Sequence, residues 1–138
     1  MMILYHASTV KIDNFYIPYG GLHMGGKHSA LEAALRKLRS PLNVVDADTV
    51  YLHVLEVDVD NVLLCEDLGS DDEWRSLIEY CDTEGYDAVQ YKNEYEPDNV
   101  PSYMIWDTSK VRIVEVDAMH MDEAEMIIED FLDEYEGV

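Results

Sequence analysis

The chain has 138 residues, of which 48% are hydrophobic, so it is long enough to build the core of one domain and too short for two domains of ordinary size. Its 30 Asp and Glu outnumber nine Lys and Arg, and the formal charge of −21 repels phosphate backbones, which argues against direct nucleic-acid binding. No apolar run reaches membrane-spanning length, and the first residues lack the basic and apolar parts of a secretion signal, so we expect a soluble, cytoplasmic protein that does not bind membranes.

A short apolar run near the start of the chain predicts the first strand. Residues Ile3 to His6 are apolar up to a terminal histidine, so a strand here delivers His6 and Ser8 to one end of a sheet. A lone histidine at such a position is more often structural than catalytic, and the pattern by itself assigns it no role.

A glycine-rich turn and a helix follow. The turn contains Gly20, Gly21, Gly25 and Gly26, and such a density of glycine lets backbone approach a ligand closely. Residues Ala30 to Leu38 combine strong helix formers with apolar residues at helical spacing, and Ser29 stands where it can cap the helix. The free N–H groups and positive dipole end of a helix after such a turn suit an anionic ligand such as a pyrophosphate.

The middle of the chain predicts two strands and a second helix. Residues 50 to 57 are rich in β-branched and aliphatic side chains, and residues 59 to 65 continue that strand or form its neighbour. Residues 71 to 84 fit a helix with acidic residues in its first turn. The two cysteines, Cys65 and Cys81, have no metal-like spacing, so we expect neither a disulfide framework nor a metal site.

A predicted hairpin with an acidic loop comes next. Residues 86 to 91 and 102 to 106 have the aromatic and β-branched content of strands, and we expect them to pair antiparallel. The loop from 92 to 101 carries Asn93, Glu94, Glu96 and Asp98. Carboxylates on a loop between rigid strands are well placed for chemistry, because the strands fix the position of what the loop presents.

The last part of the chain predicts a strand over residues 111 to 116 and an amphipathic helix over residues 122 to 135, within an acidic C-terminal segment that spans residues 119 to 138. From Met121 onward there are eight acids and no Lys or Arg. We favour a helix docked on the core with a solvated acidic face over an arm that binds a partner. The predicted fold is therefore a single compact α+β domain over residues 1–138, with a mostly antiparallel β core and flanking helices.

Four segments, taken in order, resemble the ADP-ribosyltransferase-like superfamily, in particular its small bacterial and phage-borne members. They are LYHAST, GGLHMGGKHSALEAAL, VDVDNVLLCEDLG and GYDAVQYKNEYEPDNVPSYMIWDTSKVRI. The match covers most of residues 3–115. Anti-CRISPR proteins that inactivate their target by ADP-ribosylation are similar in size and in the early glycine-rich turn, which suggests a phage setting.

The resemblance implies roles for particular residues. His6 would bind a ribose of NAD and the backbone of Ala7 would hold the nicotinamide amide. The Asn-x-x-Glu pattern runs from Asn93 to Glu96, which makes Glu96 the first choice for the catalytic carboxylate and Glu94 the reserve. The implied NAD contacts are Tyr5, His6, Ala7, Tyr19, His23, Gly25, Gly26 and Asn93. A tyrosine would stack on the nicotinamide, with Tyr16, Tyr19 and Tyr51 as the candidates, and no metal is required.

The sequence departs from the family pattern at three points. Ala7 stands where family members commonly have Gly, and Asp87-Ala88 stands where they have Asp-Gly. Gly26 occupies a position where a hydroxyl residue is common, so one polar contact with the ligand is absent.

The resulting hypothesis is a mono-ADP-ribosyltransferase that moves ADP-ribose from NAD to a protein acceptor, and so inactivates a host or defence protein. The carboxylate chemistry fits, because cleavage of the nicotinamide–ribose bond develops positive charge on the sugar. The alternative is a catalytically silent acidic protein that blocks a basic partner or mimics DNA.

Overall fold

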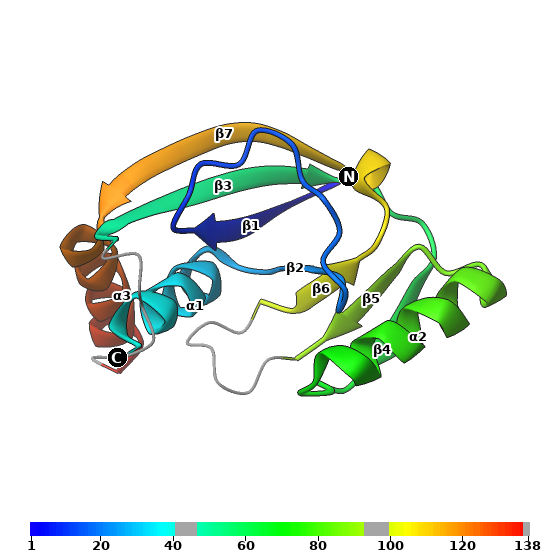
Figure 1. The fold of residues 1–138 in the computed structure, drawn as a ribbon. Helices are drawn as coiled ribbons and strands as arrows, with labels where there is room; N and C mark the ends of the chain where they lie inside the picture. The colour runs from blue at the N-terminus through cyan, green and yellow to red at the C-terminus, as the bar shows by residue number, and fades with distance from the viewer. Residues whose placement is uncertain (41–46, 93–99, 137–138) are drawn as a thin grey trace.

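The computed structural model describes residues 1–40, 47–92 and 100–136, which form two sheets and three α-helices (Figure 1). In chain order the elements are β1 (Met2–Ser8), β2 (Leu22–Met24), α1 (Lys27–Arg39), β3 (Thr49–Val57), β4 (Val62–Cys65), α2 (Asp71–Glu84), β5 (Ala88–Tyr91), β6 (Ser102–Ile105), the 3₁₀ turn η1 (Thr108–Lys110), β7 (Val111–His120) and α3 (Met121–Glu136). The expectation of a mixed α+β fold with mainly antiparallel sheets is confirmed.

The first sheet has the strand order β1-β3-β7 and is antiparallel throughout. The central strand β3 is buried at alternate positions, and Leu55 and Val57 are fully inaccessible. His6 of β1 lies directly opposite His53 of β3. A register shift between Val54 and Leu55 interrupts the pairing with β7, and such irregularities bend a strand, which agrees with the curved course of β3 and β7 in Figure 1.

The second sheet has the order β2-β6-β5-β4. The hairpin predicted from residues 86–91 and 102–106 is confirmed, because β5 and β6 pair antiparallel. The strand β4 pairs with β5 in parallel, and α2 makes the connection between them. Ser70 caps α2 by accepting a hydrogen bond from the Glu73 N–H, and Gly85 ends it in the left-handed conformation.

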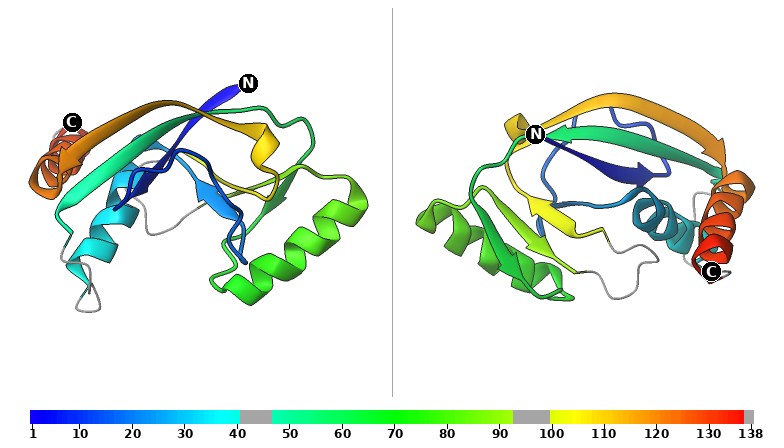
Figure 2. Two further views of the ribbon diagram at one scale, coloured as in Figure 1. Left: turned by 45° about the horizontal axis from the view of Figure 1, so that its top comes forward. Right: turned by 180° about the vertical axis from the view of Figure 1, so that it is seen from behind.

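Three hydrophobic clusters hold the sheets and helices together. The first lies between the first sheet and the helices α1 and α3, and the second lies between the two sheets. The third lies between the second sheet and α2. Figures 1 and 2 show the same arrangement, with α2 on the outer side of the second sheet and α1 and α3 together at one end of the first.

The helix α1 begins earlier than the sequence predicts. It starts at Lys27, and Gly26 occupies the N-cap position without a side-chain capping bond. Ser29 is therefore not the cap but a buried residue of the first turn. The apolar face predicted over 30 to 38 is confirmed, because Leu31 and Leu35 are fully buried against the first sheet.

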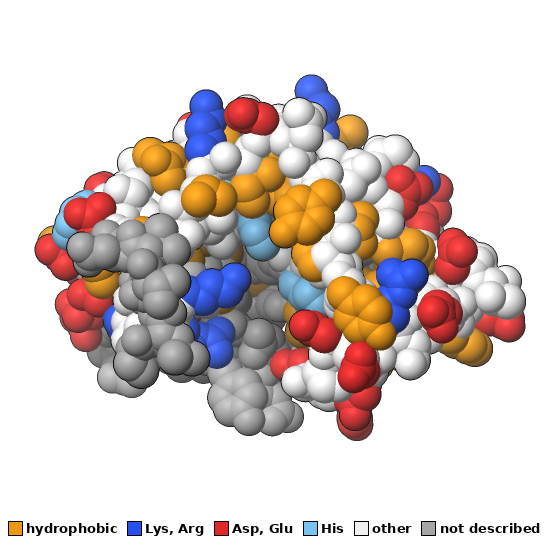
Figure 3. All heavy atoms as spheres, viewed as in Figure 1, with side chains coloured by type: hydrophobic (Ala, Val, Ile, Leu, Met, Phe, Trp, Pro, Cys, Tyr) orange, Lys and Arg blue, Asp and Glu red, His pale blue; other side chains and the backbone are white. Residues whose placement is uncertain are grey.

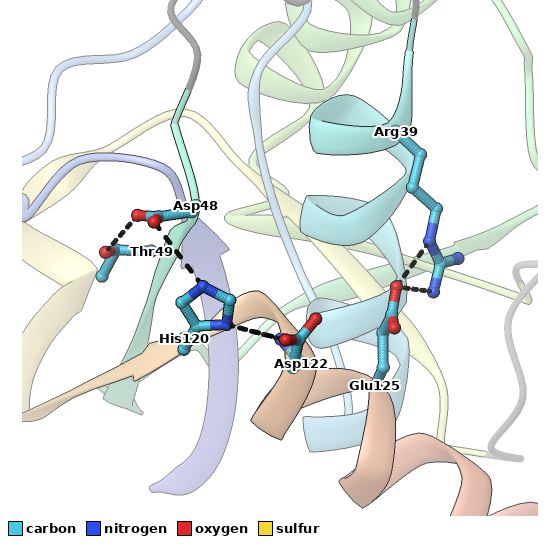
Figure 4. Close-up of polar contacts among 6 residues, drawn as sticks. All are labelled: Arg39, Asp48, Thr49, His120, Asp122 and Glu125. Carbon is cyan, nitrogen blue, oxygen red and sulfur yellow. Dashed lines mark hydrogen bonds and ion pairs between the residues drawn. The ribbon is translucent and has the colours of Figure 1, made fainter.

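The acidic C-terminal helix is docked on the core. It runs from Met121 to Glu136, one residue longer at each end than predicted, and Met119 and His120 of the predicted C-terminal segment belong to β7. Ala124 and Ile128 are buried, which agrees with the predicted docked helix. Figure 4 shows polar contacts at this junction: Arg39 of α1 donates two hydrogen bonds to Glu125, 2.9 and 3.1 Å long, and His120 lies 3.5 Å from Asp48. None of the helices in the described ranges is long and apolar enough to cross a membrane.

Candidate functional site

The two sheets meet at a backbone bridge between β1 and the residue that follows β2. The Tyr5 N–H donates to the Gly25 carbonyl at 2.8 Å, and the Gly25 N–H donates to the Tyr5 carbonyl at 3.0 Å. A Cβ at Gly25 would lie 2.9 Å from the Ser102 hydroxyl of β6, so this glycine permits the close approach of three strands.

A pocket of about 170 Å³ opens beside this bridge. Its walls come from β1, from β2 and the turn after it, from one side of α1, and from the facing ends of β5 and β6. The lining residues are Tyr5, His6, Ala7, His23, Met24, Gly25, Ser29, Ala30, Ala33, Lys37, Tyr91 and Ser102. Figure 3 shows this face hollowed between α1 and α2, with histidine side chains in the hollow and basic side chains on the α1 side.

His6 is held from both its ring and its backbone. Its Nδ1 lies 2.9 Å from the His23 carbonyl, so Nδ1–H is the donor, and its own carbonyl accepts from His53 Nδ1–H at 3.0 Å. Burial lowers the pKa of His6 below its ordinary value of 6.5, the bond to the His23 carbonyl opposes that shift, and the charge of Lys37 adds to it. At neutral pH the ring is therefore uncharged. Its Nε2 has no hydrogen-bond partner among the described residues and is an acceptor for a ligand hydroxyl.

Two hydrogen bonds fix the orientation of the His23 ring. Its Nε2–H donates to the Gly20 carbonyl at 3.0 Å, so its unprotonated Nδ1 accepts the Tyr91 hydroxyl proton at 2.7 Å. Burial lowers the pKa of His23 and keeps the ring neutral. Trp74 of α2 packs against both rings, 4.9 Å from His23 and 4.8 Å from Tyr91 between ring centroids. His23 thereby links the wall of the pocket to the hydrophobic cluster beneath α2.

His53, the third of these histidines, has a structural role. It is fully buried, its Nδ1–H donates to the His6 carbonyl, and its Nε2 accepts the Ile12 N–H at 2.9 Å. Both ring nitrogens are used within the protein, so His53 fixes the backbone of His6 and the connection after β1 rather than a ligand.

The electrostatic character of the pocket is the reverse of that of the whole chain. None of the lining residues within the described ranges is Asp or Glu, although the chain carries 30 acids. Lys37 is the charged side chain among them, with His6 and His23 neutral beside it. The pocket therefore suits a neutral or anionic ligand.

Most of the NAD contacts implied by the resemblance lie at this pocket. Five of them line it: Tyr5, His6, Ala7, His23 and Gly25. Gly26 caps α1 next to the pocket but does not line it. Tyr19 lies elsewhere, because its hydroxyl bonds to Asp72, which raises its pKa, and Arg75 sits 5.8 Å from its ring centroid.

The proposed catalytic residues lie outside the described ranges. Asn93, Glu94 and Glu96 belong to residues 93–99. The described residues nearest to them that line the pocket are Tyr91 and Ser102, at the facing ends of β5 and β6. The connection that carries the acids therefore starts and ends at the pocket.

Sequence reasoning missed seven of the lining residues, among them Lys37, Tyr91 and Ser102. Tyr91 and Lys37 line the pocket, whereas Tyr16, Tyr19 and Tyr51 do not. A usable signal for Lys37 was its helical spacing from Ala30 and Ala33, which places all three on one side of α1. Ser102 had no signal, because its role depends on the close approach of Gly25.

No three His, Cys, Asp or Glu side chains in the described ranges gather in an arrangement that could bind a metal. Comparison with models of protein families, with curated proteins and with solved structures found no match for this chain.

Proposed function

We propose that the protein is a mono-ADP-ribosyltransferase with an ADP-ribosyltransferase-like fold, acting in the cytoplasm on a host or defence protein. One observation carries the proposal. Three of the four segments on which the resemblance rests, separated by up to about ninety residues, contribute walls to one pocket: residues 5–7, residues 23–33, and Tyr91 with Ser102. The remaining segment, VDVDNVLLCEDLG, contributes β4 at the edge of the second sheet.

In this proposal the pocket takes one end of NAD. Its volume of about 170 Å³ lies below the ~300–1,000 Å³ that whole drug-sized ligands occupy. The nicotinamide and its ribose would enter, and the rest of the dinucleotide would lie across the open face. His6 Nε2 would accept a hydrogen bond from a ribose hydroxyl, and the backbone of Ala7 would hold the carboxamide.

The proposed reaction breaks the bond between ribose C1′ and the nicotinamide nitrogen. The bonding electron pair leaves with nicotinamide, and a nucleophilic side chain of the acceptor bonds to C1′ and gives up its proton. Glu96 would stabilise the positive charge that develops on the sugar, with Glu94 as the reserve. A several-thousandfold loss of rate on Glu96→Gln would correspond to roughly 5 kcal/mol of transition-state stabilisation.

The test is transfer of label from NAD to proteins of a host lysate. Wild type is expected to label an acceptor, Glu96→Gln to lose that labelling, and Glu123→Gln on the exposed face of α3 to retain it. Free ADP-ribose without labelled protein would indicate NAD hydrolysis instead. Absence of both products, with Glu96→Gln indistinguishable from wild type, would refute the proposed enzymatic activity.

A second candidate is a silent protein that blocks a basic partner. The observation in its favour is the outer face of α3, where Asp122, Glu123, Glu129, Asp130 and Asp133 are exposed and the helix has no Lys or Arg. A partner captured by both wild type and the double variant His6→Ala, Glu96→Gln, and released steeply by salt, would favour this function.

A further inference from the structure

One side of α1 forms a wall of the pocket and ends in a lysine. Ala30, Ala33 and Lys37 follow one another at intervals of three and four residues, so their side chains share a face of the helix. The two alanines leave the space that the pocket occupies. Lys37 lies about one turn beyond Ala33 and about two turns beyond Ala30, and its exposed side chain lines the pocket.

Lys37 has no ion-pair partner among the described residues. Arg39, two residues away on the same helix, lies 2.9 Å from Glu125 and 3.7 Å from Glu32. Within residues 1–40, 47–92 and 100–136, no acid lines the pocket, so none of these residues competes with a ligand for the ammonium.

Lys37 lies near His6 in the pocket. The two residues line it together, from α1 and β1 respectively, and they are close enough for the lysine charge to disfavour protonation of the imidazole. A ligand whose ribose hydroxyl bonds to His6 Nε2 carries its 5′-phosphate only a few bonds from that ribose. A phosphate so close to the ribose could form an ion pair with the single, flexible ammonium of Lys37.

We propose that Lys37 forms a phosphate subsite of this pocket and binds the phosphate adjacent to the ribose that His6 holds. The identity of the ligand as NAD rests on the proposed function; the subsite itself requires only a phosphate-bearing ligand. The start of α1, which the glycine-rich turn suggests for a pyrophosphate, also borders the pocket through Gly25, Ser29 and Ala30, although Gly26 and Lys27 do not line it.

Lys27 provides a matched control. It is exposed on the same helix, is also without an ion-pair partner among the described residues, and does not line the pocket. Lys37→Gln and Lys27→Gln change the net charge equally and replace one strong helix former by another, so both variants should fold as wild type does. Circular dichroism and thermal unfolding verify this.

The experiment is calorimetric titration of wild type, Lys37→Gln and Lys27→Gln with NAD and with inorganic pyrophosphate. We expect Lys37→Gln to bind NAD at least tenfold more weakly, which is about 1.4 kcal/mol, and Lys27→Gln to stay within twofold of wild type. The salt dependence of NAD binding should also decrease in Lys37→Gln alone.

The outcomes separate the subsite from the proposed function. NAD binding within twofold of wild type in Lys37→Gln, or equal losses in both variants, overturns the subsite and leaves the function standing. Pyrophosphate binding that depends on Lys37, without NAD binding, supports the subsite and refutes the function. No binding of either compound by wild type overturns both.

Discussion

Three histidines on neighbouring strands differ in the use of their ring nitrogens. His53 donates and accepts within the protein, and so does His23. His6 uses Nδ1 alone among the described residues, and it is the histidine whose Nε2 is left for a ligand. Sequence position alone does not separate these roles, because they depend on partners from distant segments such as Tyr91 and Ile12.

The Tyr91 hydroxyl is expected to hold His23 in its neutral tautomer. Tyr91→Phe keeps the ring packed on Trp74 but removes the donor to His23 Nδ1, which should raise the pKa of His23 and cost about 1 kcal/mol of stability. NMR titration of the histidine resonances measures the pKa. Tyr103→Phe is the control, since its hydroxyl bonds to Gln90 outside the pocket at 3.3 Å. If the pKa of His23 were unchanged in Tyr91→Phe, the Tyr91 hydroxyl would not be what stabilises the neutral ring.

At the scale of elements, strongly periodic segments could be predicted from sequence and close approaches could not. The helix α2 and the β5–β6 pair follow from local pattern, with Gly85 as a stop. The strand β2 was missed because its three residues stand among glycines that favour a turn. The parallel pairing of β4 with β5 was also missed, since it is decided by how α2 packs across the sheet.

A larger side chain on the pocket-facing side of α1 should leave the stability of the fold nearly unchanged but weaken ligand binding. Ala33 lines the pocket and is half-buried, so Ala33→Leu fills empty space, and we expect the unfolding free energy to change by less than about 1 kcal/mol. NAD affinity should fall at least tenfold, measured by calorimetry, while Ala33→Ser stays near wild type. Tight NAD binding by Ala33→Leu would place the ligand elsewhere.

The turn at Gly21, before β2, should lose more stability on substitution by alanine than the turn at Gly69. Gly21 and Gly69 both have positive φ, 85° and 81°, so alanine strains both. A Cβ at Gly21 would also collide with Met104, whereas at Gly69 it meets nothing within 4 Å. Chemical denaturation should show that Gly21→Ala costs at least ~1 kcal/mol more than Gly69→Ala. Equal losses of stability in the two variants would mean that the turn at Gly21 can accommodate a Cβ without displacing Met104.

At the scale of the whole molecule, charge is distributed unevenly. Four of the nine basic residues lie on α1, which has one acid, and α3 has no basic residue. The pocket opens beside the basic helix, so an anion that enters it approaches an element with more basic than acidic residues. The composition of the chain predicted a repulsive surface but not this local exception.

Stability should decrease as the pH falls from 7 to 5.5. Burial lowers the pKa values of His6 and His23 below 6.5, so in this range the unfolded chain binds more protons than the folded one and unfolding becomes easier. Lys37 and His53 face His6 and add to its shift, while Asp67 and Asp71 oppose the shift of His23. Urea unfolding at the two pH values measures the change. Equal or greater stability at pH 5.5 would contradict the buried, neutral state of these rings.

The most direct test of the central claim is a crystal structure of the protein with bound NAD. The proposed function requires the nicotinamide riboside between β1 and α1, with a ribose hydroxyl on His6 Nε2 and the adjacent phosphate at Lys37. NAD bound on another face, with this pocket empty and His6 and Lys37 without ligand contacts, would contradict it.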